Sequence, residues 1–141
     1  MESLLNDPLC REKGLTIEDI LHPEACELPE HKWYVMRATY CRAQKAAELI
    51  SQGGALTFLP MECRSTIVEG VRHWKKVPCM STTFFVYGTY SRVRQFTHRN
   101  HDTADGIPYV DFAFDHTSKE QNGRDRIMTV PFREMQNFIR I

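Results

Sequence analysis

The sequence predicts an α+β domain in which helices pack on a mostly antiparallel sheet of about four to five strands. Segments rich in β-branched and aromatic residues alternate with segments whose apolar residues recur at helical spacing. Two dipeptides, Glu69-Gly70 and Asn122-Gly123, are typical of tight turns between neighbouring strands. At 141 residues, the chain is long enough to enclose one hydrophobic core.

Residues 1–31 are predicted to be an acidic extension with one short helix, and residues 32–141 to be the domain. The extension holds two Lys or Arg residues against eight Asp or Glu. Its helix is predicted to begin after Thr16, which can cap a helix N-terminus. This segment either docks on the domain, covers its basic region, or remains a mobile tail. Docking would use Ile17, Ile20 and Leu21.

Lys32–Ala38 is predicted to be a central strand, because both of its faces are largely apolar. Trp33, Val35 and Arg37 point to one side, while Tyr34, Met36 and Ala38 point to the other. We expect Trp33 and Arg37 to lie near the surface. Tyr40–Gln52 follows as an alanine-rich helix, and Gly53-Gly54 ends it.

A second strand, Leu56–Leu59, leads into a predicted β-hairpin. Met61–Val68 is its first arm and Val71–Val77 its second. The second arm places four basic or histidine side chains and one aromatic in a row, namely Arg72, His73, Trp74, Lys75 and Lys76. Cations combined with an aromatic suit phosphate contact and base stacking, although exposed ribbons are often basic for solubility alone.

The remaining elements alternate again. Strands are predicted at Pro78–Tyr87, Ile107–Asp115 and 127–130. Helices are predicted at Tyr90–His98 and Phe132–Ile139, which would make two or three helices in the domain.

Charge is distributed unevenly along a chain whose formal net charge is zero. Residues 32–99 hold eleven Lys or Arg against three acidic residues, whereas residues 100–141 hold five against seven. A basic middle in a neutral protein indicates either a polyanionic partner or a solvated basic face.

Several classes of protein are disfavoured. No apolar run is long enough to cross a membrane, and the N-terminus lacks the pattern of a secretory signal, so a cytoplasmic location is expected. Five cysteines with no close pair favour free thiols. His98-x-x-His101 stands alone as a metal-like motif, and we expect no metal and no cofactor.

Two alternative functions remain. One is a stand-alone nucleic-acid-binding α+β domain. The other is a metal-dependent hydrolase built on His98, His101, Asp102, Asp105 and Asp111. These five residues belong to a loop where solvated polar groups are expected, and no nucleophile motif or phosphate loop accompanies them. The chain is therefore predicted not to be an enzyme.

The ordered motifs resemble the N-terminal (NGN) domain of the NusG family of transcription elongation factors. The resemblance covers roughly residues 32–139 and is closest to the specialised antitermination paralogues of the RfaH and UpxY type. The matching residues are Lys32-Trp-Tyr-Val-Met-Arg37, the helix with Arg42, Lys45, Ala46 and Ala47, Phe58-Leu-Pro-Met61, Lys75-Lys-Val-Pro78, Phe84-Phe-Val86 and Val130-Pro131.

The chain departs from the family pattern at three places. The usual Pro-aromatic-Pro-x-Tyr motif is replaced by Pro78-Cys-Met-Ser-Thr-Thr83, which puts Met80 at the aromatic position. The polar loop between Phe114 and Ile127 is long. The family's usual C-terminal KOW barrel is not in this sequence, so either a longer chain carries one or the domain works without it.

The resemblance implies binding to the clamp helices of the largest RNA polymerase subunit and stabilisation of the closed, processive elongation complex beside the non-template DNA strand. The implied clamp contacts are Arg37, Met80 and Phe112, supported by Phe84 and Tyr109. Phe84 and Phe112 could instead belong to the core, and for Phe84 the core is the favoured interpretation. Arg92 and Arg94 would face the gate region of the opposite lobe. The implied nucleic-acid contacts are Trp33, Arg42, Lys45, Arg72, His73, Trp74, Lys75 and Lys76.

Overall fold

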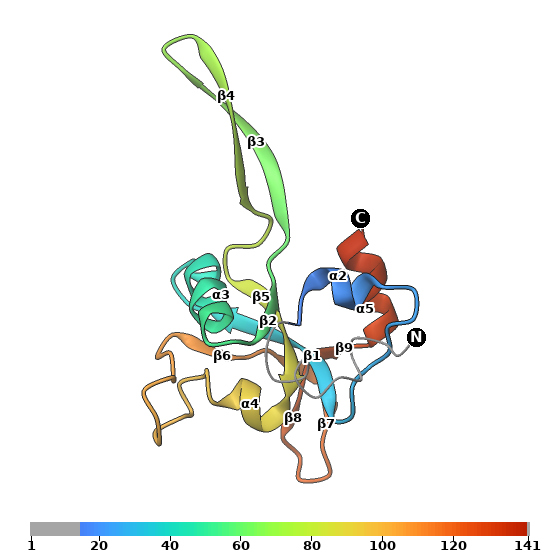
Figure 1. The fold of residues 1–141 in the computed structure, drawn as a ribbon. Helices are drawn as coiled ribbons and strands as arrows, with labels where there is room; N and C mark the ends of the chain where they lie inside the picture. The colour runs from blue at the N-terminus through green and yellow to red at the C-terminus, as the bar shows by residue number, and fades with distance from the viewer. Residues whose placement is uncertain (1–14, 141) are drawn as a thin grey trace.

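The computed structural model describes residues 15–140, and an antiparallel sheet of five strands forms its centre. These strands are β1 (His31–Ala38), β2 (Leu56–Phe58), β5 (Thr83–Thr89), β6 (Val110–Phe112) and β9 (Thr129–Val130). β1 lies in the middle and pairs with β5 along its length, and β2 pairs with the far side of β5. β6 and β9 both pair with the remaining edge of β1 (Figure 1).

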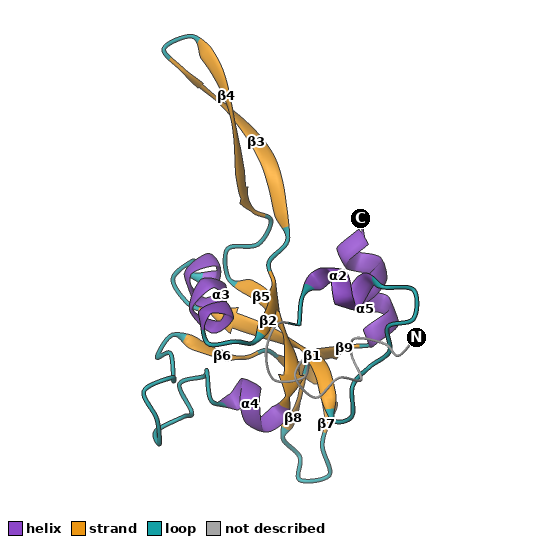
Figure 2. Cartoon of the chain, viewed as in Figure 1, coloured by secondary structure: helices purple, strands orange, loops and turns teal. Residues whose placement is uncertain are grey.

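Helices cover both faces of this sheet, so the predicted α+β class is confirmed. One face is covered by α3 (Ala43–Gln52) and α4 (Tyr90–Arg94). The other face is covered by α2 (Ile17–Leu21) and α5 (Phe132–Arg140), which lie together in Figure 2. The domain therefore has three layers with two apolar interiors.

Side chains alternate along β1, so that each of the two apolar interiors receives residues from it, as its sequence predicts. Tyr34 and Met36 pack on the α3 side, whereas Trp33 and Val35 pack on the α5 side. The expectation that Trp33 lies near the surface is wrong, because the segment before β1 and helix α5 cover it completely. Its exposed fraction is 0 %, and its ring packs 5.2 Å from the ring of Tyr87. Arg37, where the alternation reaches the end of the strand, is exposed.

Residues 15–31 dock on the domain and contribute to its core, while residues 1–14 lie outside the described range. Ile20 and Leu28 are buried in the interior beneath α5. The Gln136 side chain donates a 2.8 Å hydrogen bond to the Ile20 carbonyl, and the Leu28 N–H donates to the Tyr87 hydroxyl at 2.8 Å. Burial raises the pKa of Tyr87 to about 12, so this hydroxyl stays protonated.

The docked helix α2 begins as its sequence predicts. The Thr16 hydroxyl accepts a hydrogen bond from the Asp19 N–H at 3.3 Å, and the Asp19 carboxylate accepts one from the Thr16 N–H at 3.0 Å. This reciprocal capping box satisfies two N–H groups that a helix start otherwise leaves unpaired.

The predicted hairpin is a long ribbon of two paired strands, β3 (Met61–Val68) and β4 (Val71–Pro78). Glu69 and Gly70 connect them with φ angles of 52° and 79°, the left-handed pair required by the tightest hairpin turn. At the base, the Cys79 N–H donates to the Pro60 carbonyl at 2.9 Å. The ribbon extends far beyond the body of the domain (Figure 1).

Several predicted boundaries differ from the structure, including that of the helix predicted at Tyr90–His98, which ends at Arg94. The helix predicted from Tyr40 begins at Ala43, because Tyr40 and Cys41 both have a φ of 58°, which is incompatible with a right-handed helix. The strand predicted at Pro78–Tyr87 begins only at Thr83.

The strand predicted at Ile107–Asp115 is divided by an inserted hairpin. β6 ends at Phe112, and β7 (Phe114–Lys119) and β8 (Asp125–Ile127) form a separate two-stranded hairpin before β9 returns to the sheet. Ala113 and Met128 close its base, since the Met128 N–H donates to the Ala113 carbonyl at 2.9 Å and the Ala113 N–H to the Val35 carbonyl at 2.9 Å.

Because Ile20 is fully buried, we expect Ile20→Ala to lower the free energy of unfolding by about 2–5 kcal/mol. Chemical denaturation should show a single transition for the whole domain. Ile67→Ala is the matched control, since Ile67 is 68 % exposed on the ribbon and its truncation should change stability by no more than about 0.5 kcal/mol. Equal effects of the two substitutions would show that α2 is not part of the core.

Candidate nucleic-acid interface

The residues predicted to form one basic row on β4 lie on two different faces of the β3–β4 ribbon. Cross-strand partners share a face, and neighbours along a strand alternate between faces. One face carries Arg72, Trp74 and Lys76 opposite Ile67, Ser65 and Cys63. Every one of these side chains is exposed, and Trp74 exposes 68 % of its surface. We call this surface the Trp74 face.

The Trp74 face contains no carboxylate among its paired residues. The Arg72 guanidinium donates a 3.1 Å hydrogen bond to the Ser65 hydroxyl across the ribbon. This contact holds one cation beside Trp74 while its remaining N–H groups stay free for other acceptors. A nucleic-acid strand on this face would therefore meet two cations and one stacking surface.

The opposite face of the ribbon is less suited to an anion. It carries His73 and Lys75, together with Arg64 and Glu62. Arg64 and Glu62 form an ion pair at 2.6 Å, which neutralises one cation. The residues predicted to act as one row therefore contribute unequally, and the Trp74 face is the stronger candidate.

A second basic group lies at the start of α3. The Arg42 guanidinium lies over the rings of Tyr40 and Tyr109, at 5.6 Å and 5.0 Å from their centroids. Tyr40 is 82 % exposed, and the sequence wrongly places it inside the helix. Lys45 is exposed one turn further along α3. The aromatic partners keep the Arg42 side chain extended along the surface.

The base of the ribbon links the start of α3 to the end of β1. We call Arg42 and the two tyrosines on which it packs, Tyr40 and Tyr109, the Arg42 group. The Ala43 N–H donates to the Ser81 carbonyl at 3.0 Å, and the Ala38 N–H donates to the Thr82 carbonyl at 2.9 Å. The segment 79–82, which follows the ribbon, therefore touches both the start of α3 and the end of β1. Met80 is 39 % exposed within this segment.

An aromatic group that the sequence does not reveal lies on the α5 side of the sheet. The ring of Phe138 lies 5.8 Å from that of Phe58 and 5.7 Å from that of Phe85, and Phe138 is 39 % exposed. Arg37 shares this face, two residues beyond Val35, which pairs with Phe85. The apolar periodicity of α5 in the sequence indicates that Phe138 packs against the domain, but it does not show which strands Phe138 contacts.

Three predicted contact residues belong to the core instead. Trp33 and Phe84 are 0 % exposed and Phe112 is 2 % exposed. Phe112 pairs with Met36 in the sheet, and its ring packs between those of Tyr34 and Tyr90, each at 5.5 Å. Because solvent does not reach these rings, they cannot stack on a base or fill a partner's pocket.

The two arginines predicted to face the gate region differ in their surroundings. Arg92 is half-buried, lies 4.6 Å over the Phe96 ring and donates to the Gly53 carbonyl, so it links α4 to the end of α3. Arg94 is exposed. Tyr109 is half-buried under Arg42 and exposes only part of its ring.

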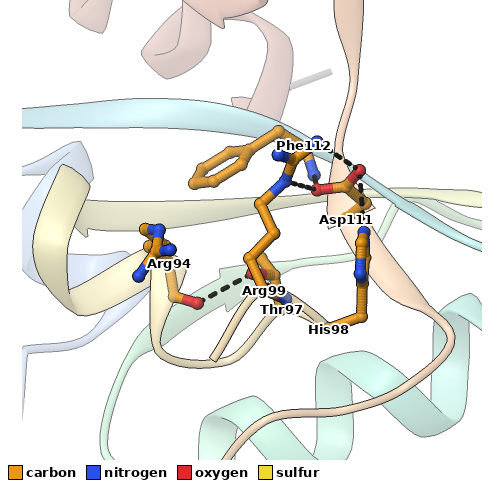
Figure 3. A network of polar contacts seen from close by, with 6 residues as sticks. All are labelled: Arg94, Thr97, His98, Arg99, Asp111 and Phe112. Carbon is orange, nitrogen blue, oxygen red and sulfur yellow. Dashed lines mark hydrogen bonds and ion pairs between the residues drawn. The ribbon is translucent and has the colours of Figure 1, made fainter. Parts of the chain in front are cut away.

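A polar network joins the loop after α4 to strand β6 (Figure 3). Asp111 accepts two hydrogen bonds from Arg99, at 2.8 Å and 3.1 Å, and one from the Phe112 N–H at 2.8 Å. His98 lies 3.2 Å from the same carboxylate. Partial burial raises the pKa of Asp111, but these hydrogen bonds, chiefly from Arg99, outweigh it and hold the pKa below its ordinary value.

The residues of the metal-hydrolase alternative do not converge. His98 contacts Asp111, whereas Asp102 and Asp105 lie in turns organised by Asn100 and Thr103. In the part of the chain that the structure describes, no group of three His, Cys, Asp or Glu side chains is placed to hold a metal ion. Among the same residues, no helix has the length and apolar character needed to cross a bilayer.

Comparison with known proteins leaves the family open. No protein-family model matches the chain, and a search of curated protein sequences found no significant match. The functional argument therefore depends on the residues and their geometry.

We expect Asp111→Asn to lower the free energy of unfolding at neutral pH by about 1–2 kcal/mol, because it removes a bidentate ion pair. A carboxylate whose pKa is depressed by folding stabilises the fold above its unfolded pKa of about 4, and this contribution disappears as pH falls through the folded value. The difference between wild type and variant should therefore shrink in acid. Asp105→Asn in the neighbouring exposed loop is the control, and a pH-independent difference would contradict this role.

Proposed function

We propose that this chain is a NusG-like transcription elongation domain that binds RNA polymerase and contacts the non-template DNA strand. The observation that carries the proposal is the Trp74 face, an exposed basic and aromatic surface on a ribbon that extends beyond the body. Cations attract the phosphates of a strand, and an indole stacks on its bases without requiring a particular sequence.

The sheet and the ribbon support the nucleic-acid part of this proposal. A two-stranded ribbon anchored at one end can reach a ligand that the body does not touch. The turn at Glu69 and Gly70 fixes its register, so Trp74 and its flanking cations share a face. The Arg42 group lies near the ribbon base and adds a further cation there.

The polymerase part of the proposal uses Met80, which follows the ribbon, together with Arg37 and the Phe58–Phe85–Phe138 group on the α5 side of the sheet. Phe138 and Met80 present exposed apolar atoms, while Arg37 supplies a charge on the Phe85 side of the sheet. An apolar centre with a charged rim is the composition of a protein-binding site. Methionine adapts its shape to a partner helix. These residues are proposed to contact the clamp helices, with Arg94 directed toward the gate region.

The proposed action is mechanical. A domain that touches the clamp on one side and the opposite lobe on the other favours the closed state by binding it more tightly than the open state. The polymerase then elongates processively, and no covalent bond is made or broken by this domain.

Substitutions on the Trp74 face test the DNA contact. We expect Arg72→Ala and Lys76→Ala each to weaken binding to single-stranded DNA and to reduce the salt slope of binding by about 0.7 for each phosphate that the variant no longer neutralises. Trp74→Ala should weaken binding by about 1–3 kcal/mol with little change in that slope. Fluorescence anisotropy across a salt series measures both quantities.

Arg64→Ala is the matched control, because Arg64 lies on the opposite face and is paired with Glu62. Its effect on affinity should be smaller than that of Arg72→Ala. Equal losses for Arg64 and Arg72 would indicate a diffuse electrostatic attraction and would remove the Trp74 face from the proposal.

Binding to an isolated clamp-helix fragment tests the polymerase contact. We expect Met80→Asp to weaken this binding about tenfold or more, because it places a charge in an apolar contact. Met128→Asp is the control, since Met128 is 38 % exposed, close to the 39 % of Met80, but lies at the base of the β7–β8 hairpin. If wild-type protein binds DNA but not the fragment, the alternative of a stand-alone nucleic-acid-binding domain is favoured.

A further inference from the structure

The inserted β7–β8 hairpin forms one wall of a pocket against the sheet. The pocket has a volume of about 740 Å³, within the range of small-molecule sites. Residues from β1, α4, β6, β7, β8 and β9 line it. Figure 1 places this hairpin at the opposite end of the domain from the tip of the β3–β4 ribbon. The pocket is therefore separate from the Trp74 face.

The aromatic wall of the pocket includes Tyr90, Phe112 and Tyr34. Tyr90 stacks on Phe112 with an angle of 15° between the rings, and 47 % of Tyr90 remains exposed. Because the buried Phe112 ring supports one side of Tyr90, the Tyr90 ring is held in place while its other side stays exposed. Burial, with a smaller contribution from Tyr90, raises the pKa of Tyr34, so its hydroxyl remains a proton donor.

The charged residues of the pocket favour an anion. Four Lys or Arg side chains line it, against two carboxylates. One carboxylate, Asp125, is already paired with Lys119 and His116. Of the four cations, Arg99 is paired with Asp111. The other three are Lys32, Arg124 and Arg126, and they outnumber the remaining acid, Glu120.

These cations come from both sides of the pocket. Lys32 belongs to β1, Arg126 to β8 and Arg124 to the turn between β7 and β8. The Arg126 guanidinium donates to the Lys119 carbonyl at 3.3 Å, which ties it to its own hairpin. An anion between the hairpin and the sheet would thus be approached by cations from two separate elements.

We propose that this pocket binds a nucleotide unit, whose base stacks on Tyr90 and whose phosphate contacts Lys32 and Arg124. A flat ring with an adjacent anion matches an aromatic wall with a basic rim. The unit can be a free nucleotide or one unstacked residue of a nucleic-acid strand, since the two share the same base and phosphate chemistry. The site extends beyond the proposed function, because neither the ribbon contact nor the polymerase contact uses it.

Binding of deoxyadenosine monophosphate and of a short oligodeoxyadenylate tests the site. Both are titrated by calorimetry into protein carrying Arg72→Ala, Trp74→Ala and Lys76→Ala, so that the ribbon does not contribute. Tyr90→Ala and Arg124→Ala should each weaken binding about tenfold. Tyr90→Phe should retain most of it. Comparable affinity for the two probes identifies a free nucleotide, and binding of the oligonucleotide alone identifies a strand.

Matched controls separate the pocket from general effects. Leu49→Ala removes a partly exposed apolar side chain of α3, and Arg133→Ala removes a surface arginine of α5. Neither should alter affinity. Arg124 lies in an exposed turn, so its variant keeps the test valid if Tyr90→Ala disturbs the fold. Absence of binding by both probes, or equal losses for Arg124→Ala and Arg133→Ala, would overturn the proposal and leave the clamp-helix result unaffected.

Discussion

The burial of β1 on both faces is the constraint on which the rest of the domain depends. A strand directs successive side chains to opposite sides, so Trp33 and Tyr34 enter different interiors. Each interior then requires its own cover, which α3 and α4 provide on one side and α2 and α5 on the other. Because both faces of β1 are buried, a one-residue slip would put its side chains into the wrong interiors, so its register is strongly specified.

The edges are therefore free to carry insertions. The ribbon begins after β2, the outermost strand on one side of the sheet. On the other side, the β7–β8 hairpin is inserted between β6 and β9. Each insertion closes its own base with backbone hydrogen bonds, at Pro60 and Cys79 and at Ala113 and Met128. Anchored extensions on opposite edges of one sheet fit the two proposed contacts, the ribbon with DNA and the β7–β8 pocket with a nucleotide.

Local signals allow part of this arrangement to be predicted from the sequence. The Glu69-Gly70 turn fixes the ribbon and its register, and the capping residues Thr16 and Asp19 fix the start of α2. Long-range contacts determine the rest. Nothing near Trp33 in the sequence shows that residues 15–31 will cover it, because that cover depends on Gln136 holding the Ile20 carbonyl. The pocket at Tyr90 likewise requires the inserted hairpin, which the sequence presents as a polar loop.

The distribution of ion pairs leaves a basic surface on the ribbon of a chain whose total charge is zero. In the body, Asp111 is paired with Arg99 and Asp125 with Lys119. The ribbon has one such pair, Arg64 with Glu62, and it lies away from Trp74. The Trp74 face therefore keeps its positive potential although the total charge is zero. Because screening limits that potential to about 8–10 Å in physiological salt, the ribbon's reach determines which anion it meets. Placing these cations on a ribbon that extends beyond the body thus supports the proposed contact with a strand beyond the domain rather than across it.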